Sequence, residues 1–247
     1  YASAWGTFNF SVTGGPVATQ PTGLCPGTTI DTVPYFTFTD NYCAQNDIAL
    51  SCRPNGGNDV VYNWVSPYTQ QMRAKTCNTN FDTVLEVLQG GTCVNGFSVG
   101  CNDDACDGSG LGSSVSFFAT AGATYFFHID GYNGAEGTTS FQLEVANDDC
   151  SSPFVLTDVP TFSVGDTRPA RDDFATVVGP ASKEVFFQYT SPSCQNLSFS
   201  TCGLNGFDTG IEVRTGGPCP GSTLVASNDD SCGLQSKVVW SADATRT

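Results

Sequence analysis

Two short acidic motifs contain the residues of this chain that are best suited to hold a metal ion. One lies in CNDDAC (101–106) and the other in SNDDSC (227–232), and an aspartate from a preceding FDT motif could approach each of them across a loop. Calcium takes about six to eight oxygen ligands, so each cluster could contribute to a calcium site without completing it. The alternative is that these side chains make turn hydrogen bonds to backbone N–H groups. The candidate ligands are Asp82, Asn102, Asp103, Asp104, Asp208, Asn228, Asp229 and Asp230.

Catalysis is a weaker interpretation of the polar residues. A serine or cysteine hydrolase needs a base, which is usually histidine. The only histidine of the sequence is His128, in the stretch YFFHID, whose alternation is typical of a β-strand. The paired aspartates lie in loops flanked by Gly and Cys and carry no glycosidase signature. We therefore expect a structural role for His128 and no enzyme activity.

The acidic motif occurs twice because the chain repeats itself. The first copy contains NDVVYNWVSP (58–67) and TCNTNFDTVLEVLQGGTC (76–93), and the second contains KEVFFQYTSP (183–192) and TCGLNGFDTGIEVRTGGPC (201–219). Matched segments in the same order are the signature of a repeated structural unit. The sequence thus predicts two copies of one fold, with a boundary near residues 147–150.

The composition predicts an all-β protein with many turns. The 247 residues include 27 Gly and 13 Pro, and Phe, Val and Thr dominate the apolar and β-branched runs. The formal net charge is −15, from 24 acidic and 9 basic residues, and it would repel a phosphate backbone. We therefore expect no nucleic-acid partner. We also expect no membrane span, because no run of about 18 apolar residues occurs.

The cysteines predict disulfides in an oxidising compartment. Twelve cysteines are spread along the chain, whereas a zinc site favours close thiolate pairs, usually with histidine. A secreted, extracellular or cell-surface protein is therefore expected. The pairs predicted from the repeat and from proximity are Cys77–Cys93, Cys202–Cys219 and Cys101–Cys106. The pairing stays open for Cys25, Cys43, Cys52, Cys150, Cys194 and Cys232.

The second copy stops short of the first. After its acidic motif the first copy continues with three strand patterns, at 113–119, 124–130 and 139–145. The second continues only into a partner of the first of these, at Val238–Trp240. The opening segment GTFNFSV (6–12) has the same form as the closing strand of the first copy. We hypothesise that the N-terminal strand supplies the missing end of the second copy.

The apolar face of that strand would enter a hydrophobic core. Phe8, Phe10 and Val12 alternate with polar residues and correspond to Phe141, Leu143 and Val145. Tyr1–Trp5 stands in more loosely for the preceding strand, and Trp5 is part of the proposed polymerisation strand. Residues 1–15 are thus interpreted as a donor strand, 16–24 as a linker, 25–146 as the first domain and 147–247 as the second, incomplete domain.

Three arrangements would satisfy the incomplete copy. The strand of the same chain gives a circularly permuted monomer. The strand of a neighbouring molecule gives donor-strand complementation, whose head-to-tail contacts close into rings or extend as filaments. Alternatively, the chain is a fragment of a longer polypeptide of such repeats. Tyr1 is itself consistent with a processed start.

Two segments match the acceptor pattern for N-linked glycans. They are Asn9-Phe10-Ser11 and Asn196-Leu197-Ser198. Asn9 would face outward from the donor strand, so a glycan there is compatible with strand insertion.

The repeated pattern resembles the bacterial pre-peptidase C-terminal domain. The resemblance implies a secreted jelly-roll β-sandwich, usually appended to extracellular enzymes or surface proteins, and related modules can bind calcium or matrix polymers. This chain departs from the pattern because it has no accompanying peptidase domain and its second copy is incomplete. The matching segments are Asn147–Cys150, 59–67, 81–93, 101–104, 123–132 and 137–145.

These observations favour a secreted structural subunit that polymerises head to tail with copies of itself. The competing hypothesis is a monomeric, self-complemented module that binds calcium and a carbohydrate or matrix polymer. Most aromatic residues occupy alternating strand positions, which is typical of core residues rather than of an exposed binding surface.

Overall fold

The computed structural model describes residues 25–106, 110–203 and 206–243. Across those ranges the chain forms strands and a single short 3-10 helix, η1 (Tyr132–Gly134), so the expected all-β, disulfide-rich fold class is confirmed. The strands are β1 (Thr28–Thr29), β2 (Tyr35–Asp40), β3 (Val60–Val65), β4 (Gln70–Lys75), β5 (Thr83–Gln89), β6 (Phe97–Asn102), β7 (Ser114–Ala119), β8 (Thr124–Gly131), β9 (Thr138–Val145), β10 (Phe154–Leu156), β11 (Phe187–Tyr189), β12 (Gln195–Ser200), β13 (Ile211–Thr215), β14 (Thr223–Asn228) and β15 (Lys237–Ala242).

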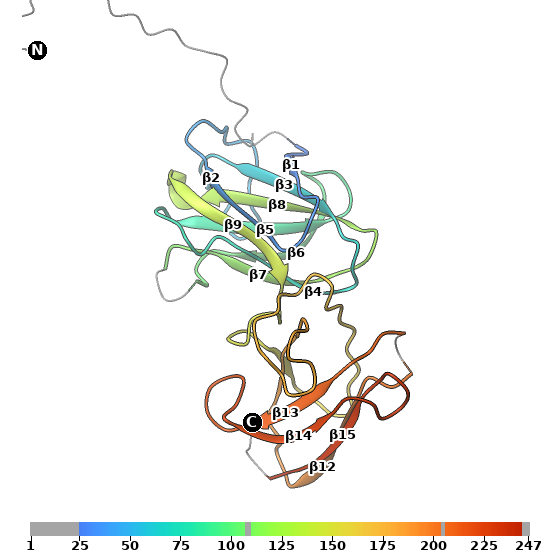
Figure 1. Cartoon of the computed structure of the whole chain (residues 1–247). Helices are drawn as coiled ribbons and strands as arrows, with labels where there is room; N and C mark the ends of the chain where they lie inside the picture. The colour runs from blue at the N-terminus through green and yellow to red at the C-terminus, as the bar shows by residue number, and fades with distance from the viewer. Residues whose placement is uncertain (1–24, 107–109, 204–205, 244–247) are drawn as a thin grey trace, which may run out of the picture.

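Strands β1–β9 form a two-layer β-sandwich, which we call the first unit (residues 25–146; Figure 1). One sheet has the order β1-β3-β8-β5-β6 and the other has the order β2-β9-β4-β7. β8 and β9 are therefore interior strands, each paired on both sides. The core between the sheets is aromatic: the ring of Phe141 stacks on Tyr62 at 4.5 Å and lies 5.5 Å from Phe127. Alternation along each strand places these side chains in the core because successive residues face opposite sides of a sheet.

Strands β10–β15 belong to a second unit (residues 147–243) whose sheets are much smaller. They form three separate two-stranded sheets, β10-β11, β12-β15 and β13-β14. Two-stranded sheets bury little apolar surface by themselves. Accordingly, large side chains such as Phe162, Phe187 and Val239 are exposed in this unit.

The pairings in the second unit repeat those in the first with the same registers. β12 pairs with β15 as β4 pairs with β7, and β13 pairs with β14 as β5 pairs with β6, including a bulge after Val87 of β5 and after the equivalent Val213 of β13. β10 runs parallel to β11, as β1 runs parallel to β3. Three residue pairs of the first unit have a counterpart in the second. Gln70↔Ala119 matches Gln195↔Ala242, Lys75↔Ser114 matches Ser200↔Lys237, and Leu85↔Asn102 matches Ile211↔Asn228.

A buried cluster of hydroxyl groups is also present in both units. The Thr76 and Thr83 hydroxyl oxygens lie 2.7 Å apart, and Ser113 donates a hydrogen bond to the Thr83 carbonyl oxygen. In the second unit Thr201, Thr209 and Ser236 make the same set of contacts. The FDT and TC motifs are therefore structural, because they place these threonines at the base of the acidic loop.

The predicted disulfide pairs are wrong, although all six cysteines are disulfide-bonded. Cys77 pairs with Cys106 and not with Cys93, and Cys202 pairs with Cys232 and not with Cys219. Cys101 pairs with Cys52 and not with Cys106. The other bonds are Cys25–Cys93 and Cys150–Cys219, while Cys43 and Cys194 are free and exposed.

The direction of the side chains explains the observed disulfides. Cys93 packs on the outer face of the larger sheet, against Phe126 and Leu88, where Cys52 and Cys101 also lie. Cys77 instead lies beside Cys106 below the acidic loop. The bonds again repeat between the units: Cys25–Cys93 and Cys150–Cys219 span 68 and 69 residues, and Cys77–Cys106 and Cys202–Cys232 span 29 and 30. Five disulfides are typical of a secreted, extracellular protein.

No helix in the described part of the chain has the length and apolar character needed to span a membrane.

Candidate functional site

By comparison with the first unit, the described part of the second unit lacks the strand that would pair with β12 on one side and with residues 161–166 on the other. In the first unit this position belongs to β9, which pairs with β2 on one side and β4 on the other. The segment VPTFSVGD (159–166) matches VPYFTFTD (33–40), which contains β2, yet residues 161–166 form no strand. Phe162 and Val164 are exposed, as are their counterparts Phe36 and Phe38 in the first unit, so the missing strand pairing and not this exposure defines the position. We call the position between 161–166 and β12 the β9-type gap.

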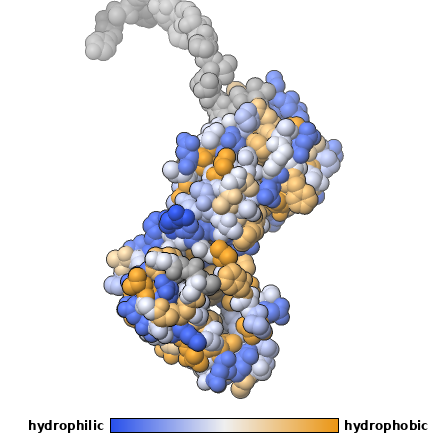
Figure 2. All heavy atoms as spheres, turned by 90° about the vertical axis from the view of Figure 1, so that its right-hand side faces the viewer, coloured by the Kyte–Doolittle hydropathy of each residue, from blue (hydrophilic) through white to orange (hydrophobic). Residues whose placement is uncertain are grey.

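A counterpart of β8 is also missing among the described residues, since no strand there pairs with both β11 and β13. In the first unit β8 lies in that position, paired with β3 on one side and β5 on the other. In the second unit no described strand joins β10-β11 to β13-β14. The side chain of Phe187 on β11 is 46% exposed, whereas its counterpart Tyr62 on β3 is 1% exposed. We call this position the β8-type gap. Figure 2 shows the lower lobe of the molecule hollowed, with apolar side chains at the margin of the hollow.

The predicted polymerisation strand lies outside the described residues. Trp5, Phe8, Phe10 and Val12, together with the candidate glycan acceptor Asn9, belong to residues 1–24. The strand that they were matched to is β9, as expected from the sequence, and Phe141, Leu143 and Val145 are fully buried in the first unit. Asn196, the other glycan acceptor, lies on β12 with an exposed side chain.

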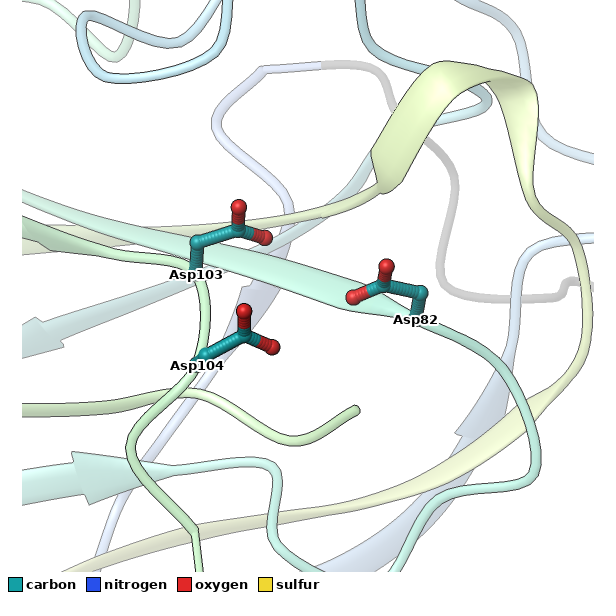
Figure 3. Close-up of side chains that lie close together, drawn as sticks. All are labelled: Asp82, Asp103 and Asp104. Atoms are coloured by element: carbon teal, nitrogen blue, oxygen red, sulfur yellow. The ribbon is translucent and has the colours of Figure 1, made fainter. Parts of the chain in front are cut away.

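The acidic residues of the first unit come together, and those of the second do not. One carboxylate oxygen from each of Asp82, Asp103 and Asp104 lies within 4.8 Å of the others, making this the single such group of three found among the described residues (Figure 3). Oδ1 of Asp82 and Oδ1 of Asp103 are buried with no hydrogen-bond partner. Burial and the neighbouring carboxylates raise the pKa of Asp82. Arg53 donates to Asp103 Oδ2 at 2.7 Å and balances part of this charge.

The corresponding residues Asp208, Asp229 and Asp230 are exposed. In the first unit the chain that follows β8 covers the cluster, because the Tyr132 N–H donates to the Asp82 carbonyl oxygen. The second unit has no described counterpart of β8 or of the turn after it, so its aspartates stay in solvent.

The two candidate asparagine ligands stabilise the backbone. Oδ1 of Asn102 accepts a hydrogen bond from the Ser114 N–H, and Oδ1 of Asn228 accepts one from the Lys237 N–H. Each bond ties the end of one strand to the start of another. The two side chains thus bond backbone N–H groups, as the alternative to metal binding expected, but they do so between strands and not within a turn.

A pair of buried aspartates near the C-terminal end of β8 was not identified from the sequence. Asp59 precedes β3 and accepts from the Asp47 and Ile48 N–H groups, and Asp130 accepts from the Gly57 and Gly131 N–H groups. Both side chains are fully buried, and each keeps one oxygen without a partner. Burial raises the pKa of Asp59 to about 6, and burial together with Asp59 raises that of Asp130 to about 7. The sequence does contain a signal for this pair, because one Asp directly precedes the apolar strand β3 and another lies near the C-terminal end of the apolar strand β8.

These raised pKa values predict that the first unit becomes more stable as the pH falls from 7.5 to 5.5. The folded unit holds protons that the unfolded chain releases above pH ~4, so folding is penalised as the pH rises through the folded pKa values. We expect a gain on the order of 2 kcal/mol in the free energy of unfolding at the lower pH. Urea unfolding at both pH values measures it, and Asp130→Asn should flatten the dependence. Stability that stays level or falls toward pH 5.5 would contradict the assignment.

His128 lies on β8 and is buried, as expected of a structural residue. Its Nε2 is 3.7 Å from the sulfur of Cys93, and burial lowers its pKa. The ring packs with the outer apolar cluster of the larger sheet and has 1% exposure.

Comparison with known proteins gives a weak likeness to a solved structure. No model of a known protein family matches the sequence, and no curated protein matches it. Among solved structures, the chain is similar to the pre-peptidase C-terminal domain of collagenase from Bacillus anthracis, with 11% identity and a TM-score of 0.34. The match covers 51% of this chain and 98% of that one. The likeness concerns the β-fold alone.

Proposed function

We propose that this protein is a secreted structural subunit that polymerises head to tail by donor-strand complementation. Residues 7–12 of one copy enter the β9-type gap of the next and join residues 161–166 to β12. The observation that supports this most strongly is the gap itself, because the second unit keeps the registers of the first but lacks its interior strands.

The proposal treats both units as copies of one pre-peptidase-C-terminal-like sandwich. Matching strand registers, two matching disulfides and the repeated hydroxyl cluster support this interpretation. A sandwich without its two interior strands leaves core side chains in water and strand edges unpaired, both of which promote association. The second unit therefore requires a partner strand.

The register of the inserted strand follows from the first unit. Leu143 of β9 lies between Tyr35 and Ala74. Phe10 takes the place of Leu143, so it would lie between Thr161 and Phe199, the counterparts of those two residues. Phe8 and Val12 then face the same core, and Asn9 and Ser11 face solvent.

A neighbouring molecule is the better source of the strand than the same chain. β1, the first described strand, lies at the end of the first unit remote from β12–β15 (Figure 1). An arm that starts there would have to run back along the whole first unit to reach its own second unit. Insertion into the next copy is a heterologous contact, which propagates into a filament unless the rotation closes a ring. We place such filaments outside the cell or at its surface, with no catalytic role.

Sedimentation velocity over a range of concentrations tests the proposal. The intact chain should form species that grow with concentration, and a chain lacking residues 1–12 should remain a monomer. An intact chain that is monomeric throughout would overturn the proposal and favour the self-complemented binding module.

We also propose that Asp82, Asp103 and Asp104 bind calcium in the first unit. Two buried carboxylate oxygens without partners support this, because unpaired buried charge is costly and a divalent cation would compensate it. One oxygen of each of the three carboxylates would face the ion, and Asp103 keeps its ion pair with Arg53 through Oδ2.

Calcium should accordingly raise the melting temperature of the first unit by several degrees at a concentration well above the dissociation constant. Differential scanning calorimetry with calcium and with a chelator measures the shift. Asp82→Asn/Asp104→Asn should abolish it, whereas the matched exposed change Asp208→Asn/Asp230→Asn should not. An equal shift in both variants would exclude this site.

A further inference from the structure

We infer that Cys43 of each copy forms a disulfide bond with Cys194 of the copy that accepts its arm, so that the head-to-tail assembly is cross-linked covalently. This inference rests on the proposed function and adds a bond to the same contact between copies. All twelve cysteines lie among the described residues, and these two alone are free. Both are exposed.

The two free thiols of one chain lie far apart. Cys43 follows β2 of the first unit and Cys194 precedes β12 of the second unit. These strands lie at opposite ends of the molecule (Figure 1). Each thiol therefore needs a second molecule to find the other.

The repeat shows which residue of the second unit corresponds to Cys43. The segment DNYCAQ (40–45) matches DTRPAR (166–171), and in both the alanine N–H donates to the carbonyl oxygen three positions earlier. Cys43 therefore corresponds to Pro169. Pro169 is buried, whereas Cys43 is exposed.

The repeat likewise identifies the counterpart of Cys194 in the first unit. The segment SPYTQ (66–70) matches SPSCQ (191–195), and in both the serine hydroxyl donates to the carbonyl oxygen two positions later. Cys194 therefore corresponds to Thr69. Thr69 is partly buried and Cys194 is exposed, so both cysteines have counterparts that are more buried.

The junction between the two units of one chain brings these matched segments into contact. The Asp166 N–H donates to Oε1 of Gln70 at 2.8 Å, and the guanidinium of Arg168 lies 5.4 Å from the centre of the Tyr68 ring. We take this junction as the template for the contact between copies. On this template the loop that contains Cys43 packs against the residues around Cys194 of the accepting copy.

The proposed arm permits the copies to stack in this way. On the register of the inserted strand Val12 takes the place of Val145, which ends β9, and Cys25 corresponds to Cys150 in the repeated disulfide. The chain from Val12 to Cys25 is longer than the chain from Val145 to Cys150. It can therefore span a junction of the same geometry.

The junction within the chain also has an ion-pair clasp that a junction between copies would lack. Arg171 donates to Asp148 and Glu144, whose side chains are both buried. The counterpart of Arg171 is Gln45, which carries no charge and cannot form these ion pairs. A disulfide would fix the contact between copies where this clasp is missing.

Formation of the bond is a two-electron oxidation. The two thiols lose two protons and two electrons as the S–S bond forms, and a low-molecular-weight disulfide accepts them and becomes two thiols. Such oxidants act in the compartments where disulfide-rich proteins such as this one form their bonds.

Non-reducing electrophoresis of the assembled, full-length chain tests the inference, after incubation with oxidised glutathione and alkylation of the remaining thiols. We expect a ladder of covalent oligomers and a peptide that joins Cys43 to Cys194 in mass spectrometry. Cys43→Ser should remove the ladder and still form filaments, because its arm is intact. Filaments of the intact chain that keep both thiols free would overturn the cross-link and leave the proposed function standing. An intact chain that neither assembles nor cross-links would overturn both.

Mixing complementary variants tests which thiols pair. Cys43→Ser and Cys194→Ser each keep one thiol, so the mixture should give covalent dimers and nothing larger, and each variant alone should give monomers. Dimers of either variant alone would show pairing between like residues and overturn the inference. The Phe8→Asp/Phe10→Asp chain should cross-link at least about tenfold more slowly, because insertion no longer raises the local concentration of the thiols. Equal rates would overturn the placement of the bond at the head-to-tail contact.

Discussion

Phe8→Asp/Phe10→Asp is expected to abolish assembly, leaving monomers at concentrations where the intact chain forms filaments in negative-stain electron microscopy. Each buried phenylalanine contributes about 2–3 kcal/mol of apolar burial. Each aspartate placed in the core would add the cost of burying a carboxylate. A loss of at least about 6 kcal/mol corresponds to roughly a 10⁴-fold weaker contact.

A matched variant distinguishes the loss of strand insertion from a general effect of added negative charge. Asn9→Asp/Ser11→Asp adds the same two negative charges to the same strand, on the face that the proposal turns to solvent. Filaments of this variant should resemble those of the intact chain. If both double variants lose filaments together, charge repulsion would explain the loss and the inward face of Phe8 and Phe10 would be refuted.

Moving residues 1–12 to follow Thr247 is expected to convert the protein into a monomer with a more stable second unit. Burying Phe8, Phe10 and Val12 contributes about 5–8 kcal/mol in total. A gain of this size should raise the melting temperature of the second unit by at least about 10 °C.

The control for this transfer carries the same arm with Phe8→Asp and Phe10→Asp. It should also be monomeric, but its second unit should melt no higher than that of a chain without the arm. A transferred arm that leaves the melting temperature unchanged would show that the gaps do not accept this segment.

Repetition and alternation in the sequence were sufficient to predict the β-fold and the matching strands of the two copies. β7, β8 and β9 lie where the patterns at 113–119, 124–130 and 139–145 placed them. These features are local, because alternation reports which face of a strand is buried. The same reasoning identified the absence of two strand patterns from residues 147–247.

The disulfides were beyond this reasoning because they depend on which face of a sheet each cysteine occupies. Cys93 and Cys106 are both near Cys77 in sequence, yet only Cys106 lies on the same side of the acidic loop. The aspartate pair Asp59 and Asp130 was missed for a related reason, since 71 residues separate its members and adjacent strands bring them together. Asp82 joins a cluster because the chain that follows β8 partly buries it, whereas Asp208 has no such cover among the described residues and is exposed.

Mixing two assembly-defective chains tests head-to-tail insertion most directly. The first, Phe8→Asp/Phe10→Asp, keeps open gaps but has no functional arm. The second carries residues 1–12 at both ends, so its own gaps are filled and its N-terminal arm is free. Each alone should be a monomer in analytical ultracentrifugation. The mixture should form a dimer of one copy of each chain and nothing longer. A mixture that stays monomeric would contradict donor-strand complementation between subunits.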